Sequence, residues 1–180
     1  FGNPSSTYSV GRHSKALIEN ARKSIAKQFN VSSSEIVFTS CGTEGNNWII
    51  RSAVRDLGVK RIITTKIEHH CTLYSIQQMA KEYGTEIQYV NILPNSEIDY
   101  NQLEELLKED VPTLVSLMHV NNEVGTILDL KRVADLCIAN KALFHTDTVQ
   151  SVGKVEIPLD EIPVDFIVAS AHKFHGPKGA

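Results

Sequence analysis

The chain has 180 residues, of which 42% are hydrophobic and 22% charged, an ordinary composition for a globular protein with a sizeable core. Its 18 Lys and Arg against 21 Asp and Glu give a net charge of −3, so we expect neither nucleic acid nor an anionic membrane surface as a partner. No apolar run approaches the ~20 residues that cross a bilayer. Three widely spaced cysteines, Cys41, Cys71 and Cys137, are typical of a reduced, cytoplasmic protein rather than a disulfide scaffold.

Short apolar segments alternate with helical patterns along the chain. Runs rich in Ile, Val, Phe and Thr predict strands at residues 35–40, 61–67, 86–92, 113–120, 142–147 and 165–171. Apolar residues at helical spacing predict helices over residues 17–29, 43–54, 72–83, 100–107 and 130–139. This alternation predicts an α/β fold, a mostly parallel sheet with helices on both faces, in one domain or part of one.

Ligands of such sheets bind outside the carboxyl ends of the strands, so the residues that follow each strand matter most. After the first, Gly42 permits close backbone approach and Thr43 stands at a helix start, where free N–H groups bind phosphate; an ordinary N-cap is the competing interpretation. After the second comes "EHHC" (68–71). Zinc is disfavoured there because adjacent residues rarely chelate one ion and no second pair of ligands follows. The other interpretation is a histidine that stacks on a flat ligand.

Polar groups also follow the later strands. "HVNNEVG" (119–125) is either a binding cluster or simply a turn. Asp147 directly follows an apolar run, so we expect a buried carboxylate that needs a partner, with a helix N-cap as the alternative. In "SAHKFHGPKG" (170–179), Lys173 has only His172 as a polar spacer. Burial would lower the pKa of such a lysine and make it a nucleophilic amine, whereas a snorkelling lysine would keep its tip in water.

The order of these features is more specific than any one of them. A phosphate-type helix start, a stacking histidine, a buried aspartate and a buried lysine all fall at strand ends. A pyridoxal 5'-phosphate (PLP) site needs this set, because the lysine holds the aldehyde as an imine and the aspartate keeps the pyridine nitrogen protonated.

Five segments in sequence carry a resemblance to a known family: "EIVFTS.GTE.NN", "EHH", "LVSLMHVNNEVGT", "FHTDTVQSVGK" and "VDFIVASAHKFHGPKG". They cover essentially the whole chain, which resembles the class V, fold-type I PLP enzymes and specifically the cysteine desulfurases of the NifS/IscS type. The resemblance implies that residues 1–180 form most of a PLP-binding large domain.

The resemblance also implies roles for individual residues. Lys173 would hold the cofactor covalently and shuttle protons, while His69 would stack on the ring and serve in acid–base steps. Asp147 would pair with the pyridine nitrogen and Gln150 with the phenolic oxygen of the ring. The remaining implied contacts are to the phosphate, from Gly42, Thr43, Ser170 and His172, and to cofactor or substrate near its carboxylate, from Asn122.

The implied reaction converts L-cysteine to L-alanine. The sulfur would pass as an enzyme persulfide to an acceptor protein, such as an iron–sulfur scaffold, in a homodimeric enzyme. The alternatives are a selenocysteine lyase or another class V PLP enzyme, or a non-catalytic scaffold. A scaffold predicts a damaged site, whereas Lys173, Asp147 and His69 are all present.

Several features depart from the family pattern. The chain opens on Phe1 and stops soon after Lys173, so both ends look cut. The small domain, the persulfide cysteine and the arginine that binds the substrate carboxylate would then lie outside these residues. Cys41 stands where the family has a glycine and Cys71 where it has a small residue, and neither matches the persulfide position. We therefore expect the 180 residues alone to be inactive, and strand 35–40 to lack its neighbour.

Overall fold

A computed structural model describes residues 2–180, which fall into two compact units. The first, here the N-terminal unit, runs to Phe38 and includes Ile157–Glu161. The second, here the sheet unit, comprises Thr39–Glu156 and Ile162–Ala180 and holds every candidate site residue. None of the described helices is both long enough and apolar enough to cross a membrane.

The N-terminal unit is built on one long helix, α1 (Ser9–Gln28), in agreement with the predicted helical pattern. A short 3₁₀ helix, η1 (Ser33–Glu35), follows. Ser32 and Glu35 form a capping box at the start of η1. The Ser32 hydroxyl accepts the Ser34 N–H at 3.3 Å, and the Ser32 N–H donates to Glu35 Oε2 at 2.7 Å.

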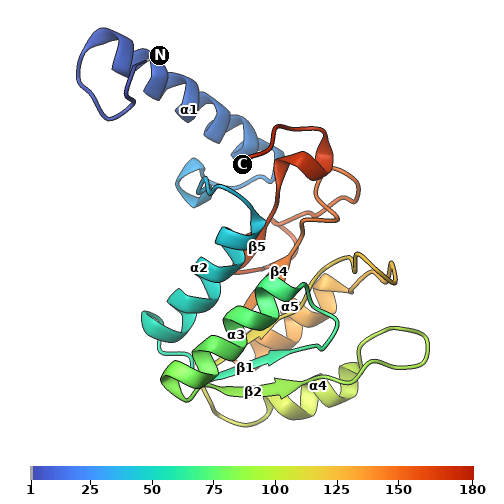
Figure 1. The fold of residues 1–180 in the computed structure, drawn as a ribbon. Helices are drawn as coiled ribbons and strands as arrows, with labels where there is room; N and C mark the ends of the chain where they lie inside the picture. The colour runs from blue at the N-terminus through green and yellow to red at the C-terminus, as the bar shows by residue number, and fades with distance from the viewer. Residues whose placement is uncertain (1) are drawn as a thin grey trace. The chain divides into compact units, whose positions relative to one another are not determined.

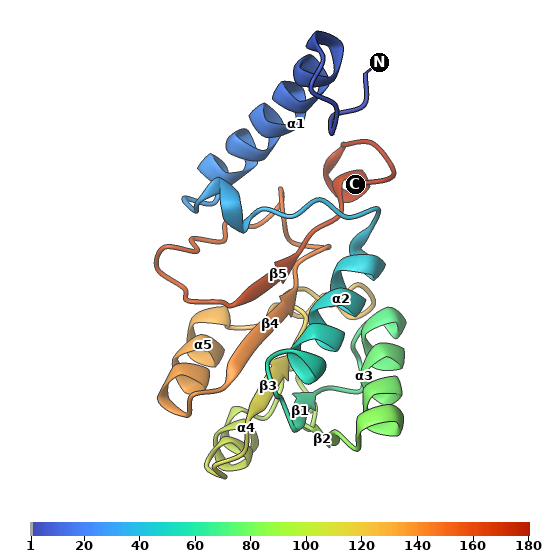
Figure 2. The same ribbon diagram turned by 90° about the vertical axis from the view of Figure 1, so that its left-hand side faces the viewer.

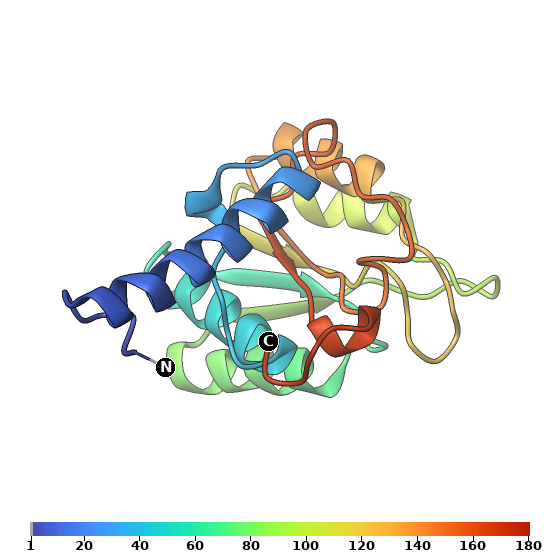
Figure 3. The same ribbon diagram turned by 90° about the horizontal axis from the view of Figure 1, so that it is seen from above.

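The sheet unit contains five parallel strands in the order β2-β1-β3-β4-β5. The strands are β1 (Arg61–Thr64), β2 (Glu86–Tyr89), β3 (Thr113–Ser116), β4 (Leu143–Asp147) and β5 (Phe166–Val168). The helices are α2 (Gly42–Arg55), α3 (His70–Tyr83), α4 (Tyr100–Leu107) and α5 (Leu130–Ala139). Within this unit, α2 and α3 cover one face of the sheet and α4 and α5 the other (Figures 1, 2 and 3). The predicted α/β class is therefore confirmed.

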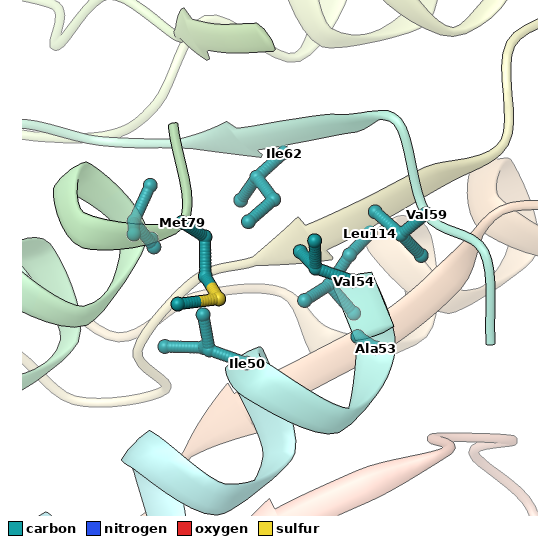
Figure 4. Close-up of a cluster of buried hydrophobic side chains, with 8 residues drawn as sticks. Ile50, Ala53, Val54, Val59, Ile62, Met79 and Leu114 are labelled. Carbon is teal, nitrogen blue, oxygen red and sulfur yellow. The ribbon is translucent and has the colours of Figure 1, made fainter. Parts of the chain in front are cut away.

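One cluster of the hydrophobic core lies between the sheet and the α2–α3 layer. Ile50, Ala53 and Val54 share one face of α2 because they are three and four positions apart, and they pack with Met79 of α3. Ile62 and Leu114, which pair in register on β1 and β3, complete this cluster (Figure 4). All of these side chains are buried, so α2 is held firmly against the strands whose ends form the candidate site.

The structure corrects two details of the predicted strands. Residues 36–40 form no strand, because none of the strands in residues 2–180 supplies a hydrogen-bonding neighbour for them. Other strands end earlier than predicted: β1 at Thr64, β3 at Ser116 and β5 at Val168. Beyond the end of β3 the pairing continues in part, because the N–H groups of Leu117 and His119 donate to the carbonyls of His145 and Asp147 at 3.1 and 3.0 Å.

Candidate active site

The carboxyl edge of the sheet collects the polar segments that follow four strands. His69 follows β1, the "HVNNEVG" turn follows β3, Asp147 ends β4, and Ser170 to Lys173 follow β5. Since all strands are parallel, these ends lie at one edge. The chain reverses its direction of strand addition between β1 and β3, and such a switch point is where open α/β sheets bind ligands.

Asp147 is buried, as its position after an apolar run predicts, with 7% of its surface exposed. Its Oδ2 accepts a hydrogen bond from Asn46 Nδ2 at 2.7 Å, and its Oδ1 accepts one from the Val149 N–H at 2.9 Å. The residues that follow form a turn, so the alternative of a helix N-cap is wrong. The two donors leave lone pairs on both oxygens for a further partner.

The start of α2 approaches this aspartate closely. Gly42 is the first residue of the helix, and a Cβ atom there would stand 2.9 Å from Val149 Cγ2 and 3.8 Å from Ser170 Cβ. A side chain at Gly42 would force Val149 or the helix to shift, so glycine lets the start of α2 lie beside both the Asp147 turn and Ser170. Thr43 lies exposed in the first turn.

Cys41 is the N-cap residue of α2 and is half-buried. Its side chain makes no capping hydrogen bond of normal geometry. Nevertheless, the nearby N–H of Glu44, and then the Ser40 hydroxyl 3.8 Å from the sulfur, favour the thiolate and lower the pKa of Cys41 below its usual value.

His69 is the N-cap of α3 and is exposed. Its Nδ1 accepts the Cys71 N–H at 3.2 Å and lies 3.0 Å from Cys71 Sγ. The preceding residue, Glu68, is buried, and this burial raises the pKa of its carboxyl to about 8, with the charge of Asp147 adding to the effect. The Thr65 hydroxyl donates to Glu68 Oε1 at 2.9 Å. Glu68 is therefore a neutral acid at pH 7.

The two asparagines after β3 take different positions. Asn121 is buried and organises the turn: its Oδ1 accepts the N–H groups of Glu123 and Val124 at 2.8 and 3.0 Å. Its Nδ2 donates to the Ile67 carbonyl at 2.8 Å, which ties the turn to the segment before His69. Asn122 is exposed at the same edge, where a ligand could reach it.

Lys173 lies on η2 (Ala171–Phe174), a 3₁₀ turn beyond β5. It is half-buried, not buried as predicted, because β5 ends at Val168 and the chain has already left the sheet. Ser170 is buried, and its Oγ lies 2.9 Å from His172 Nδ1. Gln150 is half-buried in the turn after Asp147, and Lys154 Nζ donates to its Oε1 at 3.4 Å.

The structure thus brings most of the predicted residues to one edge, but direct contacts join only some of them. Gly42 meets the Asp147 turn and Ser170, and Ser170 pairs with His172. Asn46 Nδ2 contacts both Asp147 Oδ2 and Cys71 Sγ. Sequence reasoning assigned no role to Asn46. Within residues 2–180, no three His, Cys, Asp or Glu side chains gather in a way that could hold a metal ion.

Comparisons with known proteins agree with this architecture. The family model "Aminotransferase class-V" matches residues 1–180. Cysteine desulfurase IscS of Dictyoglomus turgidum is 42% identical over 181 residues, covering 99% of this chain and 45% of that protein. A solved NifS-like protein superposes with a TM-score of 0.92 at 41% identity, covering 99% of this chain and 49% of that one. A structure described as "SspA in complex with cysteine" superposes with a TM-score of 0.91 at 33% identity, covering 99% of this chain and 52% of that one.

The chain spans about half the length of the relatives that it matches. The family model nevertheless matches its whole length, residues 1–180. The chain belongs to the class-V aminotransferase family.

Proposed function

We propose that this chain is part of a PLP-dependent cysteine desulfurase, which converts L-cysteine to L-alanine and passes the sulfur on. The observation that carries the proposal is the buried Asp147 carboxylate, held by two donors at the edge that also bears His69 and Lys173. Relatives named as cysteine desulfurases and a similar structure described with cysteine support the choice of substrate.

The residues at the edge fit PLP. A buried carboxylate with free lone pairs suits a protonated pyridine nitrogen, and a glycine-lined helix start beside a buried serine suits a phosphate. A Cβ atom at Gly42 would fill the narrow space between the start of α2 and the side chains of Val149, Val168 and Ser170, so glycine leaves that space open. Asp147, Gln150 and His69 would hold the ring, and Gly42, Thr43, Ser170 and His172 the phosphate.

When bound, PLP would supply an electron sink that stabilises negative charge developing at the substrate α-carbon. Asp147 would keep the proton on the pyridine nitrogen, which that sink requires. Lys173 Nζ would hold the aldehyde carbon covalently between turnovers and carry a proton to and from the substrate α-carbon. His69, exposed and with Nδ1 already engaged by the Cys71 N–H, would offer Nε2 for acid–base work.

We also propose that an acceptor protein, such as an iron–sulfur scaffold, takes the sulfur and that the enzyme works as a homodimer. The resemblance to the NifS/IscS type supports both proposals. On the same grounds, the cysteine that carries the sulfur lies downstream of Lys173, and Cys41, Cys71 and Cys137 have other roles.

The test is an absorption spectrum of the full gene product with PLP, followed by cysteine turnover. We expect a visible band and alanine formation in the wild type. Lys173→Ala should abolish the band and lower turnover at least about a hundredfold. Lys178→Ala, at an exposed lysine five residues later, is the matched control and should behave as wild type. A wild-type protein that stays colourless with PLP would refute the proposal and favour a non-catalytic scaffold.

A further inference from the structure

A chain of buried hydrogen bonds runs behind Asp147 and is not used in the proposed reaction. Ser116 Oγ of β3 lies 2.9 Å from His145 Nδ1 of β4, and His145 Nε2 lies 3.0 Å from Asn46 Oδ1 of α2. Asn46 Nδ2 then reaches Asp147 Oδ2 at 2.7 Å. Ser116 and His145 are fully buried and Asn46 is 1% exposed, so no solvent competes for these groups.

The direction of each hydrogen bond in this chain is determined by chemistry. An ionised carboxylate only accepts, so Asn46 must present its NH₂ group to Asp147 and its carbonyl oxygen to His145. His145 must then donate from Nε2 and accept at Nδ1 from the Ser116 hydroxyl. His145 is neutral, since burial lowers its pKa to about 4, and this agrees with a ring that carries one hydrogen.

The second hydrogen of the Asn46 amide points to another part of the edge. Asn46 Nδ2 lies 3.5 Å from Cys71 Sγ, and Cys71 Sγ lies 3.0 Å from His69 Nδ1. The sulfur therefore lies between the Asn46 amide and the His69 ring, whose Nδ1 already accepts the Cys71 N–H. One amide of α2 therefore contacts both the carboxylate at the end of β4 and the thiol beside His69.

We propose that Asn46 is a positioning residue that orients the Asp147 carboxylate for the cofactor, with its own orientation set by His145 and Ser116. This role rests on the proposed function, because it concerns the same PLP site. The Asn46 and Val149 donors fix both oxygens of Asp147, so the remaining lone pairs keep one direction toward a ring nitrogen. Without Asn46, Oδ2 would lose its buried donor and the carboxylate could rotate.

The first experiment measures the affinity for PLP by titrating cofactor-free protein and following the visible band. We expect Asn46→Ala to raise the dissociation constant about tenfold, the worth of one charge-assisted hydrogen bond. Asn47→Ala, which removes a neighbouring asparagine that bonds only the Thr43 carbonyl, should stay within about twofold of wild type. Ile50→Val lowers the stability of the same helix without touching Asp147, so it controls for loss of affinity through weakened packing.

The second experiment does not depend on the cofactor. Long-range ¹H–¹⁵N NMR spectra of the histidine side chains should show His145 with its hydrogen on Nε2. In Asn46→Ala, Nε2 loses its acceptor, so the hydrogen should no longer be confined to Nε2. If Asn46→Ala fails to fold, Ser116→Ala serves instead, with about a threefold loss of PLP affinity expected from the loosened His145 ring.

The outcomes separate the two proposals. A wild-type protein that takes up no PLP overturns the proposed function and the Asn46 role with it. Normal uptake by wild type with equal affinity in Asn46→Ala, or in Ser116→Ala, overturns the Asn46 role alone. A His145 hydrogen on Nδ1 also overturns it, because Asn46 could not then be oriented by that ring. Equal losses in Asn46→Ala and Ile50→Val would show that packing, not orientation, is responsible.

Discussion

Two cysteines illustrate how neighbouring groups decide the reactivity of single residues. Cys41 is half-buried, and the Glu44 N–H lowers the pKa of its thiol; Cys137 is buried in α5, and burial raises its pKa to about 12. Because the thiolate is the nucleophile, iodoacetamide at pH 7 should alkylate Cys41 at least about a hundredfold faster than Cys137. Peptide mass spectrometry over a time course measures both rates in one sample.

The same reaction reports on the cofactor site. If the start of α2 binds the PLP phosphate, saturating PLP should slow alkylation of Cys41, because the ligand would cover its sulfur and compete for the same N–H groups. Cys41→Ser removes the signal and identifies the peptide. Comparable labelling of Cys41 and Cys137, or faster labelling of Cys41 with PLP, would contradict this account of the helix start.

At the residue scale, the sequence predicted groups whose environment is local and missed those whose partners are distant. The burial of Asp147 follows from the apolar run before it, and the structure confirms it. The bond from Asn46 to Asp147 spans 101 positions, and no spacing in the sequence marks it. Lys173 was predicted to be buried because the apolar run continues to Ala171, but the strand stops three residues earlier.

At the scale of elements, the position of α2 depends on the absence of a side chain at Gly42. A methyl group at Gly42 would stand 2.9 Å from Val149 Cγ2, closer than carbon atoms normally approach. Gly42→Ala should therefore cost about 1–3 kcal/mol of unfolding free energy and weaken PLP binding, because either α2 or the turn after Asp147 must move. Urea unfolding and PLP titration measure the two effects.

The clash has one main partner, so it can be relieved. Val149→Ala removes the atom that the new methyl group would meet, and the double variant Gly42→Ala, Val149→Ala should recover most of both losses. Losses that simply add in the double variant would mean that Gly42 is needed for its backbone and not for the space beside Val149.

Periodicity identified the elements of this chain better than it identified their ends. All five predicted helices are present, and α4 and α5 match to the residue, because their apolar faces repeat clearly and Asp99 and Asp129 cap them. The strands were more difficult, since an apolar run does not show whether a hydrogen-bonding neighbour is present. Residues 36–38 are such a run without a neighbouring strand in the described part of the chain, and Val37 and Phe38 are exposed there.

At the scale of the whole molecule, two buried groups set opposite dependences of stability on pH. Burial raises the pKa of Glu68 from 4.5 to about 8, so the folded state holds a proton there that the unfolded state releases as pH rises. Burial lowers the pKa of His145 from 6.5 to about 4, so the unfolded state holds a proton there that the folded state lacks. The contribution of Glu68 to the unfolding free energy thus falls as pH rises from 4.5 to 8. The contribution of His145 falls as pH falls from 6.5 to 4.

Between pH 4.5 and 6.5 the two contributions cancel, because each state then carries one of the two protons. From pH 6.5 to 8 Glu68 is the only one of the two that contributes, and its contribution to the unfolding free energy should fall by about 2 kcal/mol. Glu68→Gln removes this term while keeping an acceptor for the Thr65 hydroxyl, so the fall of wild-type stability from pH 6.5 to 8 should be lost. As pH drops from 6.5 to 5, the stability of this variant should fall by at least about 2 kcal/mol, because burial lowers the pKa of both His145 and His119 and Glu68 no longer offsets them. Urea unfolding at pH 5, 6.5 and 8 tests both curves, with Glu104→Gln, at an exposed carboxylate of α4, as the control that should follow wild type. A wild-type protein whose stability rises from pH 6.5 to 8 would show that Glu68 is ionised in the folded state. The assignment of Glu68 as a neutral acid would then be wrong.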